Sequence, residues 1–255
     1  MPTVARIGIT PVKGLGLIHP DQVRLDVYGV AENRRFYMVD DAGRLFNGSR
    51  HGPIVQIRPV YDADRDTLRL EFPDGDAVEG PVELGGPVRT NFWDERDVSG
   101  RTVVGPFAAA LSAYAGRRLR LVKTDLPGDG YDIHVATLVS QASVDELGRR
   151  AGREGDPDAR RFRMLFTLAG CEPHEEDTWI GQRLEIGEAV VRIPGPVPRC
   201  VVTTQDPDTG VRDLDTLRIV KGYRGLRDGR QIDFGIYADV EEAGTVRVGD
   251  SVLPA

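Results

Sequence analysis

Short stretches in which apolar and polar residues alternate occupy most of this chain. Many of them are rich in β-branched and aromatic residues, a composition typical of strands with one buried face. Turn-forming sequences such as residues 63–67 and 72–76 separate neighbouring stretches. The pattern predicts strands within residues 3–9, 21–30, 34–41, 54–62, 67–72, 117–123, 161–170, 182–193, 200–205, 234–240 and 244–253.

Helical patterns are few. Residues 106–116 begin with a proline and end at a glycine, the usual start and stop of a helix. Residues 143–152 start with Ser143 and carry Glu146 three positions later, which predicts a helix with a capping box. A third helix is expected at 214–223. Many short strands with scattered helices predict a mostly β protein of the α+β kind, built on a closed or partly closed barrel.

The stretch 124–132 is rich in glycine, proline and aspartate and is the best candidate for a linker. It separates a β-rich first half from a second half of mixed pattern. A chain of 255 residues has room for one large domain or two small ones. We therefore expect two domains, at residues 1–123 and 124–255.

The formal net charge is −7 at pH 7, and the pI is about 5.2. Such a charge opposes nonspecific binding to nucleic acid or to an anionic membrane. The first residues lack the charged and apolar regions of a signal peptide, and no stretch approaches the ~20 apolar residues of a membrane span. We expect a cytoplasmic protein with no nucleic-acid partner and no membrane association.

The chain has only two cysteines, Cys171 and Cys200. In a reducing compartment they are not expected to form a disulfide, and they cannot supply a four-cysteine iron–sulfur site. Cys171 and His174 have C-x-x-H spacing, but a zinc site needs a second pair of ligands that the neighbouring sequence lacks. We therefore interpret Cys171 as structural.

Hydrolytic and nucleotide-binding motifs are weak or missing. His51, His134 and His174 are each a candidate base, yet no G-x-S-x-G sequence precedes a helix. The glycine spacing fits neither a dinucleotide fingerprint nor a P-loop.

Cys200 lies in a more specific context, because a proline and an arginine precede it and a β-branched run follows. The proline restricts the backbone on entry to the motif, and the charge of Arg199 favours a thiolate. The alternative is a small buried hydrophobic residue, which is the commoner role of an unpaired cysteine. The local residues alone favour that alternative.

Two other places favour anions. Lys13 lies in a glycine-rich turn after a predicted strand, where backbone N–H groups can point at a ligand. Arg34 and Arg35 begin another predicted strand, and arginine offers forked donors suited to phosphate. Solvated surface charge is the alternative for each of them.

Six segments, taken in order, resemble one known family. The chain is similar to the MOSC family, named for the C-terminal domain of molybdenum cofactor sulfurase, together with the N-terminal β-barrel domain usually paired with it. Any one segment is a weak match, and the ordered set is strong. The segments are ITPVKGLG (9–16), GVAENRRFYMVDDAGRLFNGSR (29–50), LVSQASVDEL (138–147), RRFRMLFTLAGCEPHEEDTWIGQRLEIGEAVVRI (160–193), PVPRCVVTTQDPDTG (196–210) and FGIYADVEEAGTVRVGDSV (234–252).

The resemblance implies a small N-terminal β-barrel-like domain packed on a MOSC β-barrel, with a molybdenum cofactor (Mo-molybdopterin) in the cleft between them. It implies that Cys200 ligates molybdenum, and a soft thiolate suits that metal. It places the terminal phosphate of the cofactor on Lys13 and Arg34. Further residues implied at the cofactor or the pocket wall are Ser140, Arg163, Thr203 and Asp206.

In architecture the chain resembles the amidoxime-reducing molybdenum enzymes of that family and their bacterial counterparts. The resemblance therefore implies an oxidoreductase that reduces N-hydroxylated or N-oxide substrates, whose oxygen leaves as water. One alternative is a non-catalytic carrier of the cofactor or of sulfur, with a persulfide on Cys200. Another is a MOSC protein that binds a small molecule without molybdenum. Pyridoxal phosphate is not an expected cofactor.

Reduction also requires a source of electrons. Because the sequence has no dinucleotide fingerprint and no cysteine set for an iron–sulfur cluster, we expect an external donor, a flavin reductase or a small redox protein. The resemblance ends where the sequence ends, so no fused ferredoxin-like domain is expected.

The chain departs from the family pattern at a few positions. Asn33 stands where relatives often have aspartate, and Gly14 stands where some have serine. Met164 and Leu165 replace a proline and an asparagine, which removes a polar side chain expected near the pterin.

Overall fold

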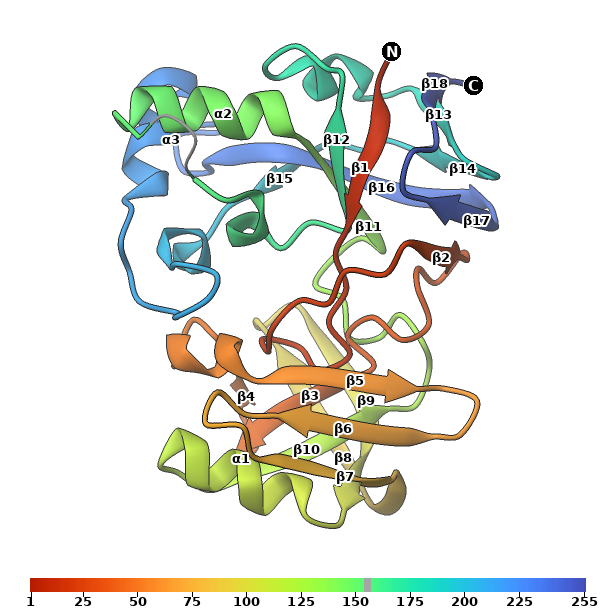
Figure 1. The fold of residues 1–255 in the computed structure, drawn as a ribbon, viewed down its shortest axis with the longest axis vertical. Helices are drawn as coiled ribbons and strands as arrows, with labels where there is room; N and C mark the ends of the chain where they lie inside the picture. Colours follow the sequence, from red (N-terminus) through yellow and green to blue (C-terminus); the bar gives the residue numbers. More distant parts are fainter. Residues whose placement is uncertain (154–156) are drawn as a thin grey trace.

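Strands supply most of the regular structure. A computed structural model describes residues 1–153 and 157–255 and shows two lobes stacked along the long axis (Figure 1). The mostly β fold expected from the sequence is confirmed. Within the described residues, no helix is both long and apolar enough to cross a membrane.

The upper lobe is built on an eight-stranded sheet with the order β1-β12-β11-β16-β14-β13-β18, in which β15 also pairs with β16. Large apolar side chains such as Ile7, Phe166 and Ile236 are wholly buried inside it. The strands are β1 (Thr3–Ile7), β11 (Ala136–Ser140), β12 (Phe166–Ala169), β13 (Arg183–Ile186), β14 (Ala189–Arg192), β15 (Pro196–Pro198), β16 (Asp233–Glu242) and β18 (Val252–Pro254).

The lower lobe has its own core, in which Phe36, Phe46 and Phe107 are wholly buried. A five-stranded sheet with the order β4-β3-β10-β9-β8 and a three-stranded sheet β5-β6-β7 enclose that core. The strands are β3 (Phe36–Asp40), β4 (Leu45–Phe46), β5 (Arg58–Asp62), β6 (Thr67–Glu71), β7 (Ala77–Pro81), β8 (Glu83–Phe92), β9 (Arg96–Val104) and β10 (Leu119–Thr124).

The first two strands lie with strands of the second half, whereas Val12 and Leu15 between them pack in the core of the lower lobe. β1 pairs antiparallel with β12, and β2 (Gln22–Leu25) pairs with β17 (Gly244–Arg247). The chain therefore begins in the upper lobe, builds the lower lobe and returns through residues 125–135. The expected domain division at 123/124 stays a prediction.

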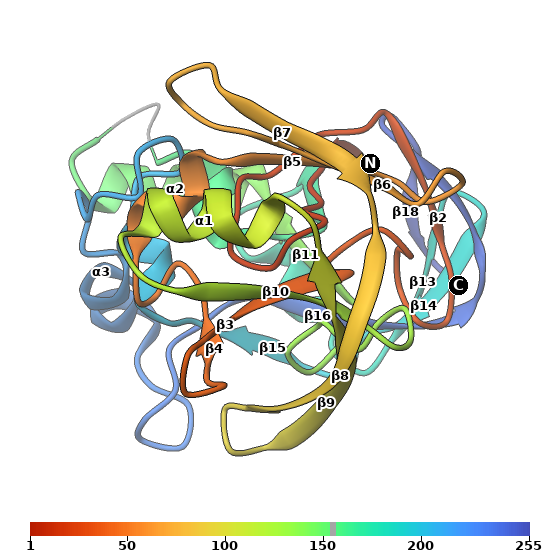
Figure 2. The same ribbon diagram turned by 90° about the horizontal axis from the view of Figure 1, so that it is seen from below.

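The three expected helices form, with shifted ends for two of them. Helix α1 (Phe107–Ala115) follows Pro106 and ends at left-handed Gly116, as expected. It packs beside β10 in the lower lobe (Figure 2), where the Ser112 hydroxyl accepts the Leu119 N–H at 2.9 Å. Helix α3 (Thr216–Arg224) is capped by Asp215.

The expected N-cap of the second helix is wrong by one turn. Helix α2 (Gln141–Arg150) is capped by Ser140, whose hydroxyl accepts the Ser143 N–H at 3.1 Å. Ser143 is buried inside the first turn, where its hydroxyl donates to the Glu176 carboxylate at 2.8 Å. The capping-box pattern placed the N-cap at Ser143. The Ser143 hydroxyl instead bonds to the carboxylate of Glu176, which is distant in the sequence.

The strand expected at 200–205 is also wrong, because Val201–Thr204 form a 3₁₀ helix. The hydroxyls of Thr203 and Thr204 donate to the carbonyls three residues earlier, which closes the turn locally. Other 3₁₀ helices are Gly52–Gln56, which replaces the start of the strand expected at 54–62, Ala159–Phe162 and Glu175–Trp179. The hairpin of β8 and β9 was not predicted, because its outer half is mostly exposed and carries little apolar alternation.

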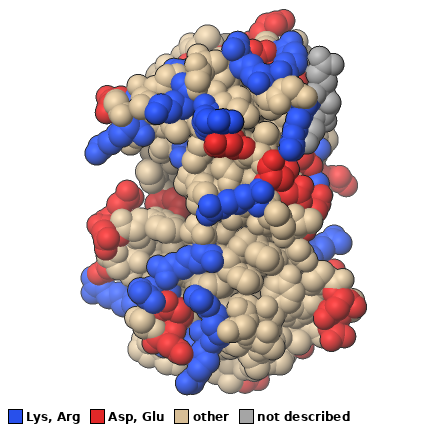
Figure 3. Space-filling model, turned by 90° about the vertical axis from the view of Figure 1, so that its left-hand side faces the viewer, with Lys and Arg blue, Asp and Glu red and all other residues tan. Residues whose placement is uncertain are grey.

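Surface charge is mixed despite the net negative total. On the face shown in Figure 3, Lys and Arg side chains are spread over both lobes and interspersed with acidic groups.

We predict that Gly130→Ala destabilises the protein. Gly130 lies in the segment that returns to the upper lobe, and a Cβ atom there would collide with the backbone carbonyl of Arg34. Forcing extra volume into a tight contact costs about 1–3 kcal/mol. The measurement is the free energy of unfolding in urea. Gly86→Ala is the matched control, because a Cβ at Gly86 meets nothing within 4 Å. Equal stability of the two variants would contradict the prediction.

Candidate functional site

A cleft of about 530 Å³ lies where the two lobes meet. The lower lobe and the crossing segments contribute residues from within the ranges 8–17, 33–34, 47–49 and 131–137 to its wall. The upper lobe contributes the segments 160–165 and 197–207. A volume of this size suits a small organic ligand or cofactor.

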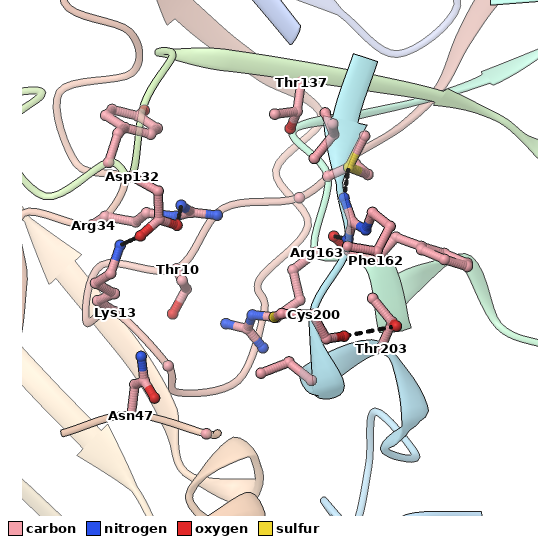
Figure 4. A pocket seen from close by; sticks show the side chains of 18 of the residues that line it. Thr10, Lys13, Arg34, Asn47, Asp132, Thr137, Phe162, Arg163, Cys200 and Thr203 are labelled. Carbon is pink, nitrogen blue, oxygen red and sulfur yellow. Dashed lines mark hydrogen bonds and ion pairs between the residues drawn. The ribbon is translucent and has the colours of Figure 1, made fainter. Parts of the chain in front are cut away.

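At one end of the cleft, here called the cation end, Lys13 and Arg34 surround the carboxylate of Asp132 (Figure 4). Lys13 Nζ donates to Asp132 Oδ1 at 2.8 Å and to the Gly130 carbonyl at 2.8 Å. Arg34 Nη1 donates to the other oxygen of Asp132 at 3.1 Å. Trp93 Nε1 donates to Asp132 Oδ1 at 2.8 Å.

The backbone explains how these side chains meet. The Lys13 N–H donates to the Phe36 carbonyl at 2.8 Å, which fixes the glycine-rich turn on β3. Arg34, just before β3, has a left-handed backbone with φ of 55°. Its N–H donates to the Thr10 carbonyl at 2.7 Å. Lys13 and Arg34 therefore lie on adjacent segments and converge on Asp132.

Burial dominates the electrostatics of this end. Lys13 is only 5% exposed, and burial lowers its pKa to about 8, although Asp132 opposes the shift. Burial alone would raise the pKa of Asp132, but Lys13 and Arg34 hold that pKa well below its usual range. The carboxylate is thus ionised and partly neutralises two cationic side chains.

The opposite end carries the Cys200 thiol, which is exposed to the cleft. β15 and the following residue attach this segment to β16, with the Arg199 N–H donating to the Ile232 carbonyl at 2.7 Å. The Cys200 carbonyl then accepts the N–H of Thr203 at 3.2 Å and its hydroxyl at 3.0 Å. Strand and turn together present the thiol to the cleft.

Arg163 extends into the space between the two ends (Figure 4). Its Nη2 donates to the Leu15 carbonyl at 2.5 Å, across the boundary between the lobes. Burial lowers its pKa to about 10, and the nearby charge of Arg34 acts in the same direction. Arg163 remains a cation at neutral pH.

Arg199 also lines the cleft, and neighbouring residues hold its guanidinium group. Its Nη2 donates to the Phe162 carbonyl at 2.5 Å, and its Nη1 lies 3.3 Å from the Met164 sulfur. Burial lowers the pKa of Arg199 to about 10. Met164, one of the departures from the family pattern, thus supports the arginine that precedes Cys200.

Six of the seven residues proposed from the sequence line this cleft, namely Lys13, Arg34, Arg163, Cys200, Thr203 and Asp206. Ser140 does not line it, because it is fully buried as the N-cap of α2 and bonded to Ser143. Asp206 accepts the N–H and hydroxyl of Thr209 at 2.8 and 2.9 Å, so its carboxylate mainly shapes the turn after Thr203.

The Cys171 thiol lies apart, packed against the barrel core. Burial and the neighbouring Glu175 raise its pKa to about 12. His174 Nε2 lies 3.2 Å from the Tyr223 hydroxyl. No group of three or more His, Cys, Asp or Glu side chains suited to a metal ion occurs in the described part of the chain.

Asp132 and Trp93 were not proposed from the sequence. Asp132 belongs to the stretch interpreted as a linker, and Trp93 lies at the unpredicted turn between β8 and β9. Neither carries a local signal, because Asp132 contacts Lys13 and Arg34, and Trp93 contacts Asp132, across long distances in the sequence.

Comparison with known proteins identifies the family. Residues 128–253 match the MOSC domain, and residues 1–112 match the MOSC N-terminal beta barrel domain. "Mitochondrial amidoxime reducing component 2" of Homo sapiens is 40% identical over 98% of this chain and 82% of its own length. The chain belongs to the MOSC family. The resemblance inferred from the ordered segments is confirmed.

Other relatives of this MOSC protein carry two kinds of name. The Rattus norvegicus "Mitochondrial amidoxime reducing component 2" is 28% identical over 98% of this chain and 82% of its own length. A "Molybdenum cofactor sulfurase" from Caenorhabditis briggsae is 24% identical over 99% of this chain and 36% of its own length.

The depressed pKa of Lys13 predicts a pH dependence of stability. Between about pH 8 and 10.5 the folded state binds fewer protons at Lys13 than the unfolded state does, so its contribution to the free energy of unfolding rises with pH. From pH 8 to pH 10 the rise is about 2 kcal/mol. Lys13→Met removes it, and urea unfolding at pH 8 and pH 10 measures the difference from the parent. Lys221→Met, at an exposed lysine, is the control. A parent-like pH dependence in Lys13→Met would show that burial does not depress this pKa.

Proposed function

We propose that this MOSC protein is a molybdenum-cofactor-dependent oxidoreductase that reduces N-hydroxylated or N-oxide substrates. The observation that supports this most is the arrangement of one cleft, with the Cys200 thiol at one end and Lys13 and Arg34 at the other. The names of the amidoxime-reducing relatives support the reaction class.

The donor set at Cys200 fits a metal that brings most of its own ligands. Because no cluster of three metal-ligating side chains occurs among the described residues, a bare metal ion would be poorly held. A single soft thiolate is suited to a metal already bound by the sulfurs of a pterin dithiolene. Cys200 would supply that thiolate, and its exposed thiol faces the space such a ligand requires.

The cation end fits a phosphate. Lys13 and Arg34 carry two positive charges against the one negative charge of Asp132, and Arg163 adds a third positive charge in the same cleft. Charged donors make strong hydrogen bonds to phosphate oxygens. A phosphate would also stabilise the charged form of Lys13, whose pKa burial otherwise lowers.

The departures from the family pattern have structural roles that leave the cleft open. Asn33 Oδ1 accepts the Thr10 N–H at 2.9 Å, which braces the turn that carries Lys13. Gly14 has φ of 95°, a backbone conformation that the serine of some relatives would adopt only with strain.

In this proposal the cofactor supplies the two-electron redox chemistry when it is bound. The chain orients it between the cation end and Cys200. The apolar parts of the wall, including Phe162, Met164 and Leu165, exclude water from the reacting region. Arg163 remains charged and steers an electron-rich oxygen of the substrate toward the middle of the cleft.

A second function is supported by the exposed thiol and by the name of the sulfurase relative. In that case Cys200 would hold a persulfide or a delivered cofactor and catalyse no reduction. Metal and sulfur analysis of protein from a molybdate-replete host distinguishes the two functions. Near-stoichiometric molybdenum supports the reductase, and sulfane sulfur without molybdenum supports the carrier.

We predict that Cys200→Ser loses molybdenum and N–O reduction while it keeps its fold. A serine hydroxyl is a harder and less readily ionised ligand than a thiol. Metal content, circular dichroism and amidoxime reduction are measured on the same preparation. Cys171→Ser is the matched control and should retain molybdenum and activity, because that thiol packs against the core away from the cleft. Full molybdenum content and activity in Cys200→Ser would overturn the metal assignment.

We also predict that the protein requires a separate electron donor. The sequence has no dinucleotide fingerprint, so NADH or NADPH alone should give no turnover of an amidoxime or a hydroxylamine. Reduced viologen should restore turnover in molybdenum-loaded protein, and a flavin reductase or small redox protein would supply the electrons physiologically. Turnover with the nicotinamide alone would refute the donor requirement. Inactivity of loaded protein with viologen would refute the reductase function.

A further inference from the structure

His134 is the one histidine among the described residues that line the cleft. It lies just before β11, two residues after Asp132, and its side chain is 25% exposed. The contacts described above for Lys13, Arg34 and Cys200 do not include His134. Reduction of an N–O bond consumes protons, and an accessible imidazole is the commonest side chain for proton transfer near neutral pH.

The pairing of β11 with β16 sets the position of this imidazole. Thr137 lies opposite Tyr237 in the antiparallel register. Tyr237 and Asp239 are two positions apart on β16 and therefore project from the same face of the strand. His134 reaches both of them, with its ring centroid 4.6 Å from that of Tyr237 and its Nδ1 2.7 Å from Asp239 Oδ1.

The partner at Nδ1 decides the tautomer. Asp239 as a carboxylate only accepts hydrogen bonds, so Nδ1 of His134 carries a proton. Within residues 1–153 and 157–255, Nε2 of His134 has no hydrogen-bond partner. It is also not one of the fully buried atoms that lack a partner, so it is accessible. An imidazole oriented by a carboxylate, with its second nitrogen open to a cleft, is arranged to take up and deliver a proton.

Tyr237 connects this imidazole to the rest of the wall. Burial raises the pKa of Tyr237, so its phenol stays neutral, and the charges of Arg199 and Asp132 act on it. Arg199 in turn adjoins Cys200. The wall thus runs from His134 through Tyr237 and Arg199 to the thiol.

On the basis of the proposed function, we propose that His134, positioned by Asp239, donates the proton to the oxygen that leaves the substrate. In the overall step the N–O bond of a hydroxylamine breaks, the external donor supplies two electrons, and the products are the N–H compound and water. The cofactor, when bound, would supply the redox chemistry of this step. Nε2 of His134 takes up a proton from solvent and passes it to the departing oxygen, while Nδ1 keeps its proton on Asp239. Solvent supplies the second proton. The titratable groups in contact with His134 are Asp239 and Tyr237, both from β16. Asp132, two residues earlier in the same loop, lines the same cleft.

The test compares His134→Gln and Asp239→Asn with the parent, each loaded with molybdenum and supplied with reduced viologen. We expect kcat/KM for a hydroxylamine to fall about 100-fold in His134→Gln, the lower range for loss of a general acid. Asp239→Asn should lose less, and molybdenum content should be unchanged in both. The decline in parental kcat/KM toward alkaline pH should be absent in His134→Gln. Added imidazole should partly restore His134→Gly.

The control variant is His51→Gln, because His51 does not line the cleft and stacks on Phe46. If His134 had only a structural role, His134→Gln would lose molybdenum, or it would lose the same fraction of kcat/KM at every pH and imidazole would not rescue His134→Gly. Either result would overturn the proposal. Parent-like kinetics of His134→Gln would do the same. If the fully loaded parent reduces no N–O substrate, the proposed function fails, and the role of His134 fails with it.

A measurement independent of turnover examines the geometry. Diethyl pyrocarbonate acylates accessible, unprotonated imidazole nitrogens, and mass spectrometry locates the label. In metal-free protein, His134 should be labelled faster than His174, whose Nε2 lies against the Tyr223 hydroxyl and whose Nδ1 is buried. Slower labelling of His134 than of His174 would show that Nε2 is not open to the cleft and would overturn the proposal.

Discussion

The carboxylate of Asp132 is the group on which the cation end of the cleft depends. Lys13 is almost wholly buried, and a buried ammonium is stable only beside a negative charge or strong acceptors. Asp132 and the carbonyl of Gly130 supply both at 2.8 Å, and they come from the segment that joins the lobes. The contact therefore neutralises charge and ties the returning chain to the turn after β1.

The same region concentrates unusual backbone conformations. Seven non-glycine residues in the described part of the chain have positive φ, and three of them, Arg34, Trp93 and Arg163, line the cleft. Such conformations persist where surrounding contacts hold them, and they cluster at functional sites. Here they aim two guanidinium groups and an indole N–H into one space. The lobes are joined again where Gln205 donates to the Gly48 carbonyl at 2.9 Å, and both residues line the cleft.

Local patterns in the sequence predicted much of the molecule. Alternation gave most strands, and helix α1 begins and ends where proline and glycine indicate. The errors arose where a side chain found a partner that local rules do not include. Ser143 bonds to Glu176 instead of capping the helix, and the threonines after Cys200 fold back on the preceding carbonyls. Ser140 matched a family motif that proved to be a buried helix cap.

The sequence by itself determined the family, the β-rich fold and six of the residues in the cleft, because ordered motifs and alternating patterns are written in neighbouring positions. Only the tertiary structure brought Lys13, Arg34 and Trp93 to Asp132, and His134 to Asp239. Those pairs lie 39 to 119 residues apart. Strand register and the crossing of the chain between the lobes decide which charged residues are buried together. No local sequence pattern encodes either of these.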